Sequence, residues 1–69
     1  MKQIGETIKQ RRRQLGITQQ TLAMLAGVGI NTIVSIERGS NSASLATLMK
    51  LTDCLGLEIK LDVRGTAAL

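Results

Sequence analysis

The sequence predicts an all-α domain of four to five short helices, followed by one short C-terminal β-strand. Two observations carry this prediction. Up to residue 56, glycines separate stretches in which apolar residues recur every three or four positions, the spacing of one helix face. From residue 57 the apolar residues alternate with charged ones, a period of two that is typical of a half-buried strand.

The first two helices are predicted from apolar spacing and capping residues. The first is expected to end near Gly16 and to bury a stripe formed by Ile4, Ile8 and Leu15. The second is predicted over residues 19–26, because Thr18 is a favourable N-cap. Its buried face is expected to comprise Leu22, Leu25 and Ala26, with Ala23 beside them.

Two further helices follow. A third is expected over residues 30–38, with Ile33 and Ile36 facing inward and Gly39 as its C-cap. Ser44 can cap a fourth helix that ends at Gly56. Its apolar side is expected to consist of Leu45, Leu48, Met49, Leu51, Thr52 and Leu55.

Residues 57–64 form the predicted strand and residues 65–69 a flexible tail, so that residues 1–56 make up the helical domain. A single strand leaves its backbone groups unpaired, and the simplest partner is the same strand of a second subunit. A chain of 69 residues also has a marginal core of its own. We therefore expect a homodimer that pairs through Leu57, Ile59, Leu61 and Val63. A fifth amphipathic helix or a frayed tail is the alternative.

The composition excludes several classes of function. The chain has 9 Lys and Arg against 5 Asp and Glu, one Cys, and no His, aromatic residue or Pro. Without histidine there is no His-based catalytic triad, and one cysteine alone cannot build a zinc site. No apolar run reaches the length of a membrane span. We expect a basic binding module in a reducing cytoplasm, with no enzymatic activity, metal or cofactor.

The most informative residues are those that suit two crossing helices. Ala23 is small enough for a close crossing, and Gly27 tolerates the positive φ that a tight turn between the helices requires. Val28 can plug the turn, while Ile33 and Ile36 can hold the second helix of the pair. Together these residues predict a helix-turn-helix unit.

The same residues resemble the Cro/C1-type (Xre-type) helix-turn-helix family over about residues 4–57. The resemblance is carried by TQQTLA at 18–23, GV at 27–28, TI at 32–33, IERG at 36–39, SL at 44–45, TL at 47–48 and LG at 55–56. The short terminal strand also resembles the HipB-type antitoxins. In that group two C-terminal strands pair, and the dimer represses its own operon and binds a HipA-type kinase toxin.

The resemblance implies that residues 30–35 enter the major groove of double-stranded DNA, that Gln19 bonds a phosphate, and that Arg12 pairs with Glu37. The residues' own chemistry agrees, since Asn31 can read adenine through a bidentate contact and helix N-termini suit phosphates. The expected base-reading residues are Ile30, Asn31, Val34 and Ser35. The expected residues for phosphate contact and positioning are Thr18, Gln19, Gly29, Thr32 and Arg38.

Two positions depart from the family's pattern. Gly29 stands where the family often has Ser or Thr, so it offers no hydroxyl to a phosphate or base. Ile30 stands where the family often has Gln or Arg. Ile30 and Val34 lie on a different face from Ile33 and Ile36, and there they can touch thymine methyl groups. In the alternative, Ile30 covers the edge of the core and Val34 is simply tolerated at the surface.

The leading functional hypothesis is a sequence-specific DNA-binding repressor that acts as a homodimer on an inverted repeat. Within it, an antitoxin that regulates its own operon and binds a HipA-type toxin is favoured over a free-standing phage-like repressor. The rival hypothesis is a protein-interaction module that has kept the fold and lost DNA binding.

Overall fold

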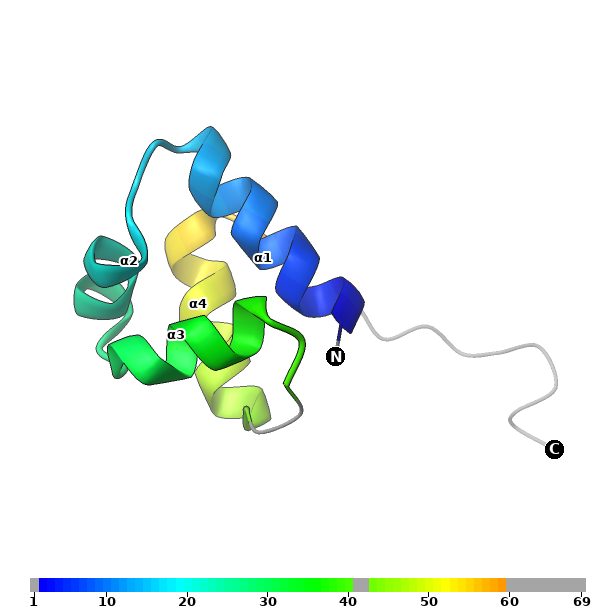
Figure 1. The fold of residues 1–69 in the computed structure, drawn as a ribbon. Helices are drawn as coiled ribbons and strands as arrows, with labels where there is room; N and C mark the ends of the chain where they lie inside the picture. Colours follow the sequence, from blue (N-terminus) through cyan, green and yellow to red (C-terminus); the bar gives the residue numbers. More distant parts are fainter. Residues whose placement is uncertain (1, 41–42, 60–69) are drawn as a thin grey trace, which may run out of the picture.

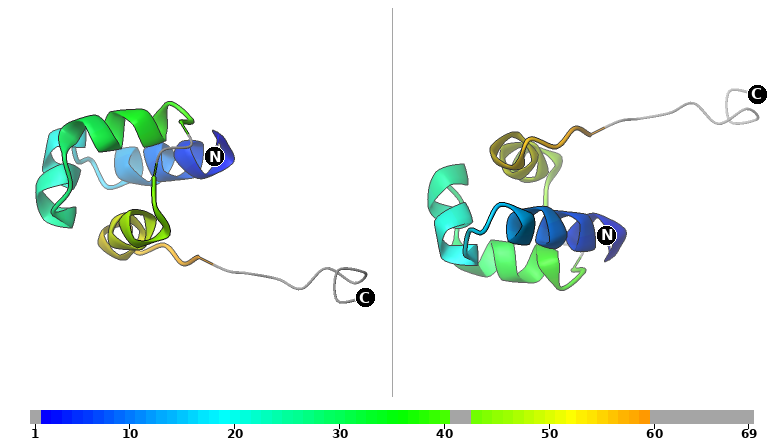
Figure 2. Two further views of the ribbon diagram at one scale, coloured as in Figure 1. Left: turned by 90° about the horizontal axis from the view of Figure 1, so that it is seen from below. Right: turned by 90° about the horizontal axis from the view of Figure 1, so that it is seen from above.

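The computed structural model describes residues 2–40 and 43–59, which form a bundle of helices (Figure 1). In chain order these are α1 (Lys2–Gln14), α2 (Gln19–Ala26), α3 (Ile30–Glu37) and α4 (Leu45–Leu55). Helices α1 and α2 each contact both α3 and α4. Figure 2 shows that α3 and α4 lie on opposite faces of the domain, so the two faces can serve different purposes.

The ends of the helices follow from capping chemistry. The hydroxyl of Thr18 accepts a hydrogen bond from the amide of Thr21 at 3.0 Å, and the hydroxyl of Ser44 accepts one from the amide of Thr47 at 3.2 Å. Each satisfies an amide that the first turn of a helix leaves without a partner. At the other end, α4 stops at Gly56, whose φ of 68° is left-handed and favours glycine. The predicted N-caps Thr18 and Ser44 are therefore confirmed.

The core is entirely aliphatic and is shared by all four helices of the described chain. As predicted, Ile33 and Ile36 face inward from α3, with exposed fractions of 0% and 1%. The other buried members of the cluster are Ile8, Leu22, Ala23, Leu48, Leu51 and Leu55. Burial of such side chains stabilises the fold by about 1.5–3 kcal/mol each. This core holds α3 in a defined orientation.

Some apolar residues expected in the buried stripes lie at the surface instead. Leu25 of α2 is 60% exposed, and Leu15, which lies beyond the end of α1, is 44% exposed. Ile4, Leu45 and Met49 are also exposed. The prediction was wrong at these positions because a helical stripe is buried only where another element covers it. The spacing of apolar residues does not show how far that cover extends.

Helix α1 approaches α3 closely at a glycine. Gly5 is buried, and a Cβ placed on it would overlap with the backbone carbonyl oxygen of Ile36. Only a residue without a side chain fits between the two backbones. A glycine inside a helix costs about 1 kcal/mol relative to alanine, so its presence here is explained by the close approach.

The segment after α4 is described only as far as Ile59. Leu57 packs against the core, and its amide donates a 2.8 Å hydrogen bond to the carbonyl oxygen of Thr52 near the end of α4. Residues 57–59 have no regular secondary structure in this single chain. Most of the predicted strand, with Leu61 and Val63, and the predicted tail lie outside the described residues. The strand therefore stays a prediction.

Candidate nucleic-acid interface

Helices α2 and α3 are joined by the tight turn that the sequence predicts. Gly27 has a φ of 71°, and the amide of Val28 donates to the carbonyl oxygen of Ala23 at 3.0 Å. Val28 is partly buried and packs against the core, so it closes the space between the two helices. Ala23 is 6% exposed, which agrees with a small residue at a close crossing. The turn fixes the direction in which α3 leaves α2.

One face of α3 is left open. Asn31 and Arg38 are exposed, Ile30 is 41% exposed, and Val34 and Ser35 are half-buried. These residues occupy one side of the helix, opposite Ile33 and Ile36. Neither Ile30 nor Val34 belongs to the buried core cluster. The side chain of Ile30 is thus partly accessible from outside, and its contact with thymine methyl groups stays a prediction.

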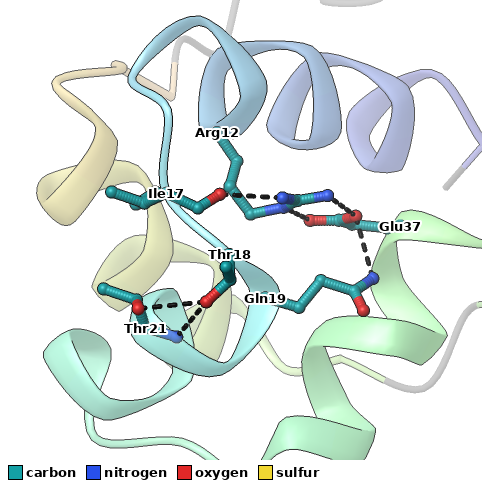
Figure 3. Close-up of polar contacts among 6 residues, drawn as sticks. All are labelled: Arg12, Ile17, Thr18, Gln19, Thr21 and Glu37. Carbon is teal, nitrogen blue, oxygen red and sulfur yellow. Dashed lines mark hydrogen bonds and ion pairs between the residues drawn. The ribbon is translucent and has the colours of Figure 1, made fainter.

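A buried ion pair ties the end of α3 to α1 (Figure 3). Arg12 Nε donates to Glu37 Oε2 at 2.6 Å, and Arg12 Nη2 donates to Glu37 Oε1 at 3.0 Å, a two-point contact. The side chains are 11% and 3% exposed, respectively. The hydrogen bond from Arg12 to Glu37 raises the pKa of Arg12 above its already high value, so the guanidinium stays charged. The contact that the family resemblance implied is present.

The ion pair is completed by two further hydrogen bonds. Arg12 Nη1 donates to the backbone carbonyl oxygen of Ile17 at 2.9 Å, and Gln19 Nε2 donates to Glu37 Oε1 at 3.1 Å. The carboxylate of Glu37 thus accepts three hydrogen bonds from two side chains, as a buried charge requires. Figure 3 shows that the cluster joins α1, the α1–α2 loop, the start of α2 and the end of α3.

Gln19 occupies a different environment from the one expected for a free phosphate ligand. Its side chain is half-buried and is held by Glu37. The side-chain amide nitrogen has two N–H groups, and one hydrogen bond leaves the second available. Thr18 is likewise engaged in the structure, since its hydroxyl both accepts from the amide of Thr21 and contacts Thr21 Oγ1 at 3.0 Å.

Gly29 immediately precedes α3 and is its N-cap. It has extended backbone angles and provides no side-chain cap hydrogen bond. Its carbonyl oxygen accepts hydrogen bonds from the backbone amides of Thr32 at 3.1 Å and Ile33 at 3.3 Å. The side chain of Thr32 is half-buried. Gly29 therefore serves as the N-cap through its backbone alone, as the sequence allowed.

The exposed surface of α2 and α3 carries no negative charge. No charged residue occurs between Gln14 and Ile36, and the next one, Glu37, is buried against Arg12. Arg13 and Arg38 are exposed. Arg11 is not free, because its Nε donates to the carbonyl oxygen of Leu55 at 2.8 Å. No acidic side chain on α2 or α3 is exposed, so nothing there repels a polyanion.

Sequence reasoning missed two structural residues. Nothing in the sequence assigned Arg11 a structural role, yet it holds the C-terminal end of α4. Gly5, in the middle of a helix, had been given no role. The signal that could have identified Gly5 was present, since a helix-interior glycine needs a packing reason. No local signal identifies the carbonyl that Arg11 reaches, because it lies 44 residues away.

The described residues contain no cluster of His, Cys, Asp or Glu that could hold a metal ion. Among the same residues, no helix is both long and apolar enough to cross a membrane. What they do contain is a compact helix-turn-helix whose second helix presents an open face without acidic side chains, with the exposed Arg38 at its C-terminal end. These features define the class of helix-turn-helix modules that transcriptional regulators use.

Comparison with known proteins gives the same class. The helix-turn-helix family model matches residues 8–61, and the chain belongs to this Cro/C1-type family of transcriptional regulators. It is 39% identical over 51 residues to an uncharacterized helix-turn-helix transcriptional regulator of Methanothermobacter thermautotrophicus, covering 74% of each chain. A similarly named regulator of Haemophilus influenzae is 47% identical over 45 residues, which are 65% of this chain and 46% of the relative.

A solved structure has the same fold. The chain is similar to the restriction-modification controller protein C.AhdI from Aeromonas hydrophila, with a TM-score of 0.76 and 32% sequence identity. The match covers 83% of this chain and 86% of that protein. The prediction of an all-α, Cro/C1-type helix-turn-helix fold is therefore confirmed.

Proposed function

We propose that the protein is a sequence-specific repressor that binds double-stranded DNA as a homodimer on an inverted-repeat operator. The observation that carries the proposal is the open face of α3, where Asn31 lies between exposed Ile30 and half-buried Val34. The core and the Arg12–Glu37 pair hold that face in place. A helix face that no other described element covers, and that carries no exposed negative charge, suits the major groove.

In this proposal the α3 face reads bases. Asn31 contacts an adenine through a bidentate pair of hydrogen bonds, while Ile30 and Val34 contact thymine methyl groups. The hydroxyl of Ser35, one position further along, can donate to or accept from a base edge. The combination predicts an operator half-site rich in A·T pairs.

Other residues position the protein on the phosphate backbone. The N-terminal turns of α2 and α3, which begin after Thr18 and Gly29, direct amides outward, and Arg38 supplies the positive charge. Gln19 uses the N–H that Glu37 leaves free, and Thr32 contributes its hydroxyl. Such contacts orient the protein without reading sequence.

The dimer places two copies of α3 in successive major grooves, roughly 34 Å apart. The C-terminal residues 57–64 join the copies. Since α3 and α4 lie on opposite faces (Figure 2), a dimer formed on the α4 side leaves both recognition faces free.

Two physiological settings are consistent with such a repressor. The alternating segment 57–64 supports an antitoxin that represses its own operon and binds a HipA-type toxin. The likeness to C.AhdI supports a controller of a restriction-modification operon. Co-expression with the genes that flank this one separates the two, since only an antitoxin would co-purify with a kinase.

The test of DNA reading is a binding titration. Duplexes are selected from a random library with the purified protein, and the selected site and its single-base variants are titrated by fluorescence anisotropy at two salt concentrations. Asn31→Ala is expected to weaken specific binding by about 1–3 kcal/mol and to relax the preference at one adenine. Gln10→Ala, which removes an exposed amide from α1, is the matched control and should change nothing.

Gln19→Ala is expected to change the binding affinities in a different way from Asn31→Ala. It should weaken binding to all duplexes about equally, because a phosphate contact carries no sequence information. Absence of binding to any duplex at low salt would contradict the repressor proposal and favour a protein-interaction module. An unchanged base preference in Asn31→Ala would show that α3 does not read DNA in this way.

A further inference from the structure

The start of α1 lies against the turn that follows α3. A Cβ placed on Gly5 would overlap with the backbone carbonyl oxygen of Ile36. One turn earlier on α1, Lys2 meets Gly39, where an added Cβ would lie 3.4 Å from the Cα of Lys2. The two contacts follow each other in opposite order along the two segments, so α1 and α3 run in opposite directions here (Figure 2). Lys2 therefore lies beside the C-terminal end of the helix that is proposed to read DNA.

The side chain of Lys2 is packed at its base and free at its tip. Its Cβ and Cγ atoms both lie 3.6 Å from the position of an added Cβ on Gly39, so the aliphatic stem runs along the turn. Lys2 is exposed, and within residues 2–40 and 43–59 no acidic group lies within ion-pair distance of its ammonium group. The same is true of the guanidinium group of Arg38, the residue before Gly39. Two exposed cations from different helices thus flank one turn.

The exposed charge at this turn is positive. Glu6 is the acidic residue of α1, and it is exposed one helical turn further along the helix than Lys2. Glu37 is nearer to the turn, but its carboxylate is buried and paired with Arg12. The charged groups that the turn offers to a ligand are therefore the cations of Lys2 and Arg38, and cations of this kind bind phosphate.

Arg38 connects the turn to the base-reading face of α3. It follows Asn31 by two helical turns and so occupies the same side of the helix. Along the helix axis the two residues are about 10.5 Å apart, and the major groove of B-DNA is about 12 Å wide. With Asn31 at the base edges, the turn after α3 reaches the border of the groove, where the phosphates lie.

We propose that Lys2 binds the phosphate backbone of the operator next to Arg38, so that α1 is part of the DNA interface. The inference deepens the proposed DNA binding and depends on it. A DNA strand is the ligand because both cations are exposed beside the base-reading face, where a run of phosphates passes. A small anionic ligand would need a cavity, and neither residue lines the two hollows along α4.

Lys2 positions the protein and reads no base. Its ammonium group is a point charge on a flexible stem, which suits a phosphate without demanding a fixed geometry. The contact should therefore strengthen binding to every duplex by the same factor, in contrast to Asn31, whose effect depends on the base. Because the stem packs on Gly39, a bound phosphate also ties the start of α1 to the end of α3.

The salt dependence of DNA binding tests the contact. Lys2→Gln is compared with the parent in protein without an N-terminal tag, because the residue is second in the chain. In a plot of the logarithm of the association constant against the logarithm of the salt concentration, the slope should become shallower by about 0.9 per subunit, the contribution of one phosphate. Lys2→Arg should keep the parent slope. An unchanged slope in Lys2→Gln overturns the proposal.

Lys50→Gln is the matched control. It makes the same charge change at an exposed residue of α4, on the face opposite α3, and should leave the slope as it is. If it changes the slope as much as Lys2→Gln does, the effect is one of net charge and the proposal is wrong. Both variants should unfold at the Tm of the parent, because neither ammonium group has an ion-pair partner in the described part of the chain. A lower Tm for Lys2→Gln alone would assign Lys2 a structural role instead.

Neutral phosphates locate the contact on the DNA. In an operator obtained by selection, each phosphate in turn is replaced by an uncharged methylphosphonate, and the duplexes are titrated with the parent, Lys2→Gln and Arg38→Gln. A substitution that weakens the parent and leaves Lys2→Gln unaffected marks the phosphate that Lys2 binds. It should be the phosphate that Arg38 binds, or the next one on the same strand, because the two residues flank Gly39. Phosphates further apart overturn the proposal.

The same titrations keep the two proposals apart. A parent that binds no duplex contradicts both of them. A parent that reads its operator through Asn31, with a salt slope that does not respond to Lys2→Gln, contradicts only the contact made by α1.

Discussion

Two consecutive arginines of α1 hold the two faces of the domain in different ways. Arg12 reaches α3, where it makes a two-point contact with the buried carboxylate of Glu37. Arg11 reaches α4, where its Nε donates one 2.8 Å hydrogen bond to the carbonyl oxygen of Leu55. The α3 side is thus fixed by a buried charge pair with further partners, and the α4 side by a charged hydrogen bond to the backbone at a helix end.

The difference agrees with what each face presents. The α3 face presents side chains such as Asn31 and Ile30 in a fixed orientation. A hydrogen bond to a ligand is directional, so the helix that carries the bonding group has to be held rigidly. The α4 face offers an apolar groove between the start of α1 and α4, and apolar association tolerates small adjustments because the hydrophobic effect has no direction. The following changes test this contrast, beginning with the one expected to have the largest effect.

Breaking the ion pair should be the most damaging change. Arg12→Ala or Glu37→Ala leaves a buried charge without its partner, and each should lower the free energy of unfolding by about 3–5 kcal/mol. In a 69-residue chain this is a large part of the total stability. Urea denaturation followed by circular dichroism measures the loss. The neighbouring exposed Arg13→Ala is the control, and equal stability of all three variants would contradict the role of the pair.

Filling the contact between α1 and α3 should have the next largest effect. Gly5→Ala places a methyl group against the carbonyl oxygen of Ile36, and the two helices must separate, at a cost of about 1–3 kcal/mol. Thermal unfolding measures the loss, with the exposed neighbour Glu6→Ala as control. At an ordinary helix position the same change would stabilise by about 1 kcal/mol, so the sign of the effect decides.

Removing the contact on the α4 side should cost less than removing the ion pair. Arg11→Ala loses the charged hydrogen bond to the carbonyl oxygen of Leu55 and a longer, exposed one to Gln14, and the cost should be about 1 kcal/mol because solvent can take their place. Urea denaturation of this variant beside Arg12→Ala measures the contrast between the two faces directly. If the two variants lose equal free energy of unfolding, then Arg11 stabilises the α4 side as much as Arg12 stabilises the α3 side, and the proposed difference between the two faces is wrong.

The smallest effect is expected at the start of α3. Gly29→Ser adds a hydroxyl at an N-cap that now has none, in a position where an added Cβ meets only Thr32 Oγ1 at 3.8 Å. Stability should rise by a few tenths of a kcal/mol, measured as an increase in Tm. The new hydroxyl should also strengthen binding to duplexes of any sequence. A loss of stability would show that Gly29 is needed for a reason other than capping.

Much of this protein was determined by local sequence. The helices, the caps at Thr18 and Ser44, the turn at Gly27 and the inward pair Ile33 and Ile36 were all predicted, because each depends on residues at most one helical turn apart. The outward position of Asn31 follows from the same spacing once the inward pair is known. The Arg12–Glu37 contact came from the family resemblance, since nothing local joins residues 25 positions apart.

Only the tertiary structure decided which apolar residues are buried and which polar ones are free. Leu25 belongs to an apolar stripe yet is 60% exposed, because no element covers that side of α2 in the described chain. Gly5 is required because two backbones meet there, and Gln19 is held because α3 brings Glu37 beside it. Whether a residue is buried or paired depends on which distant part of the chain packs against it. Periodicity describes only the face that a residue occupies, and the neighbour that meets it is set by how the helices pack.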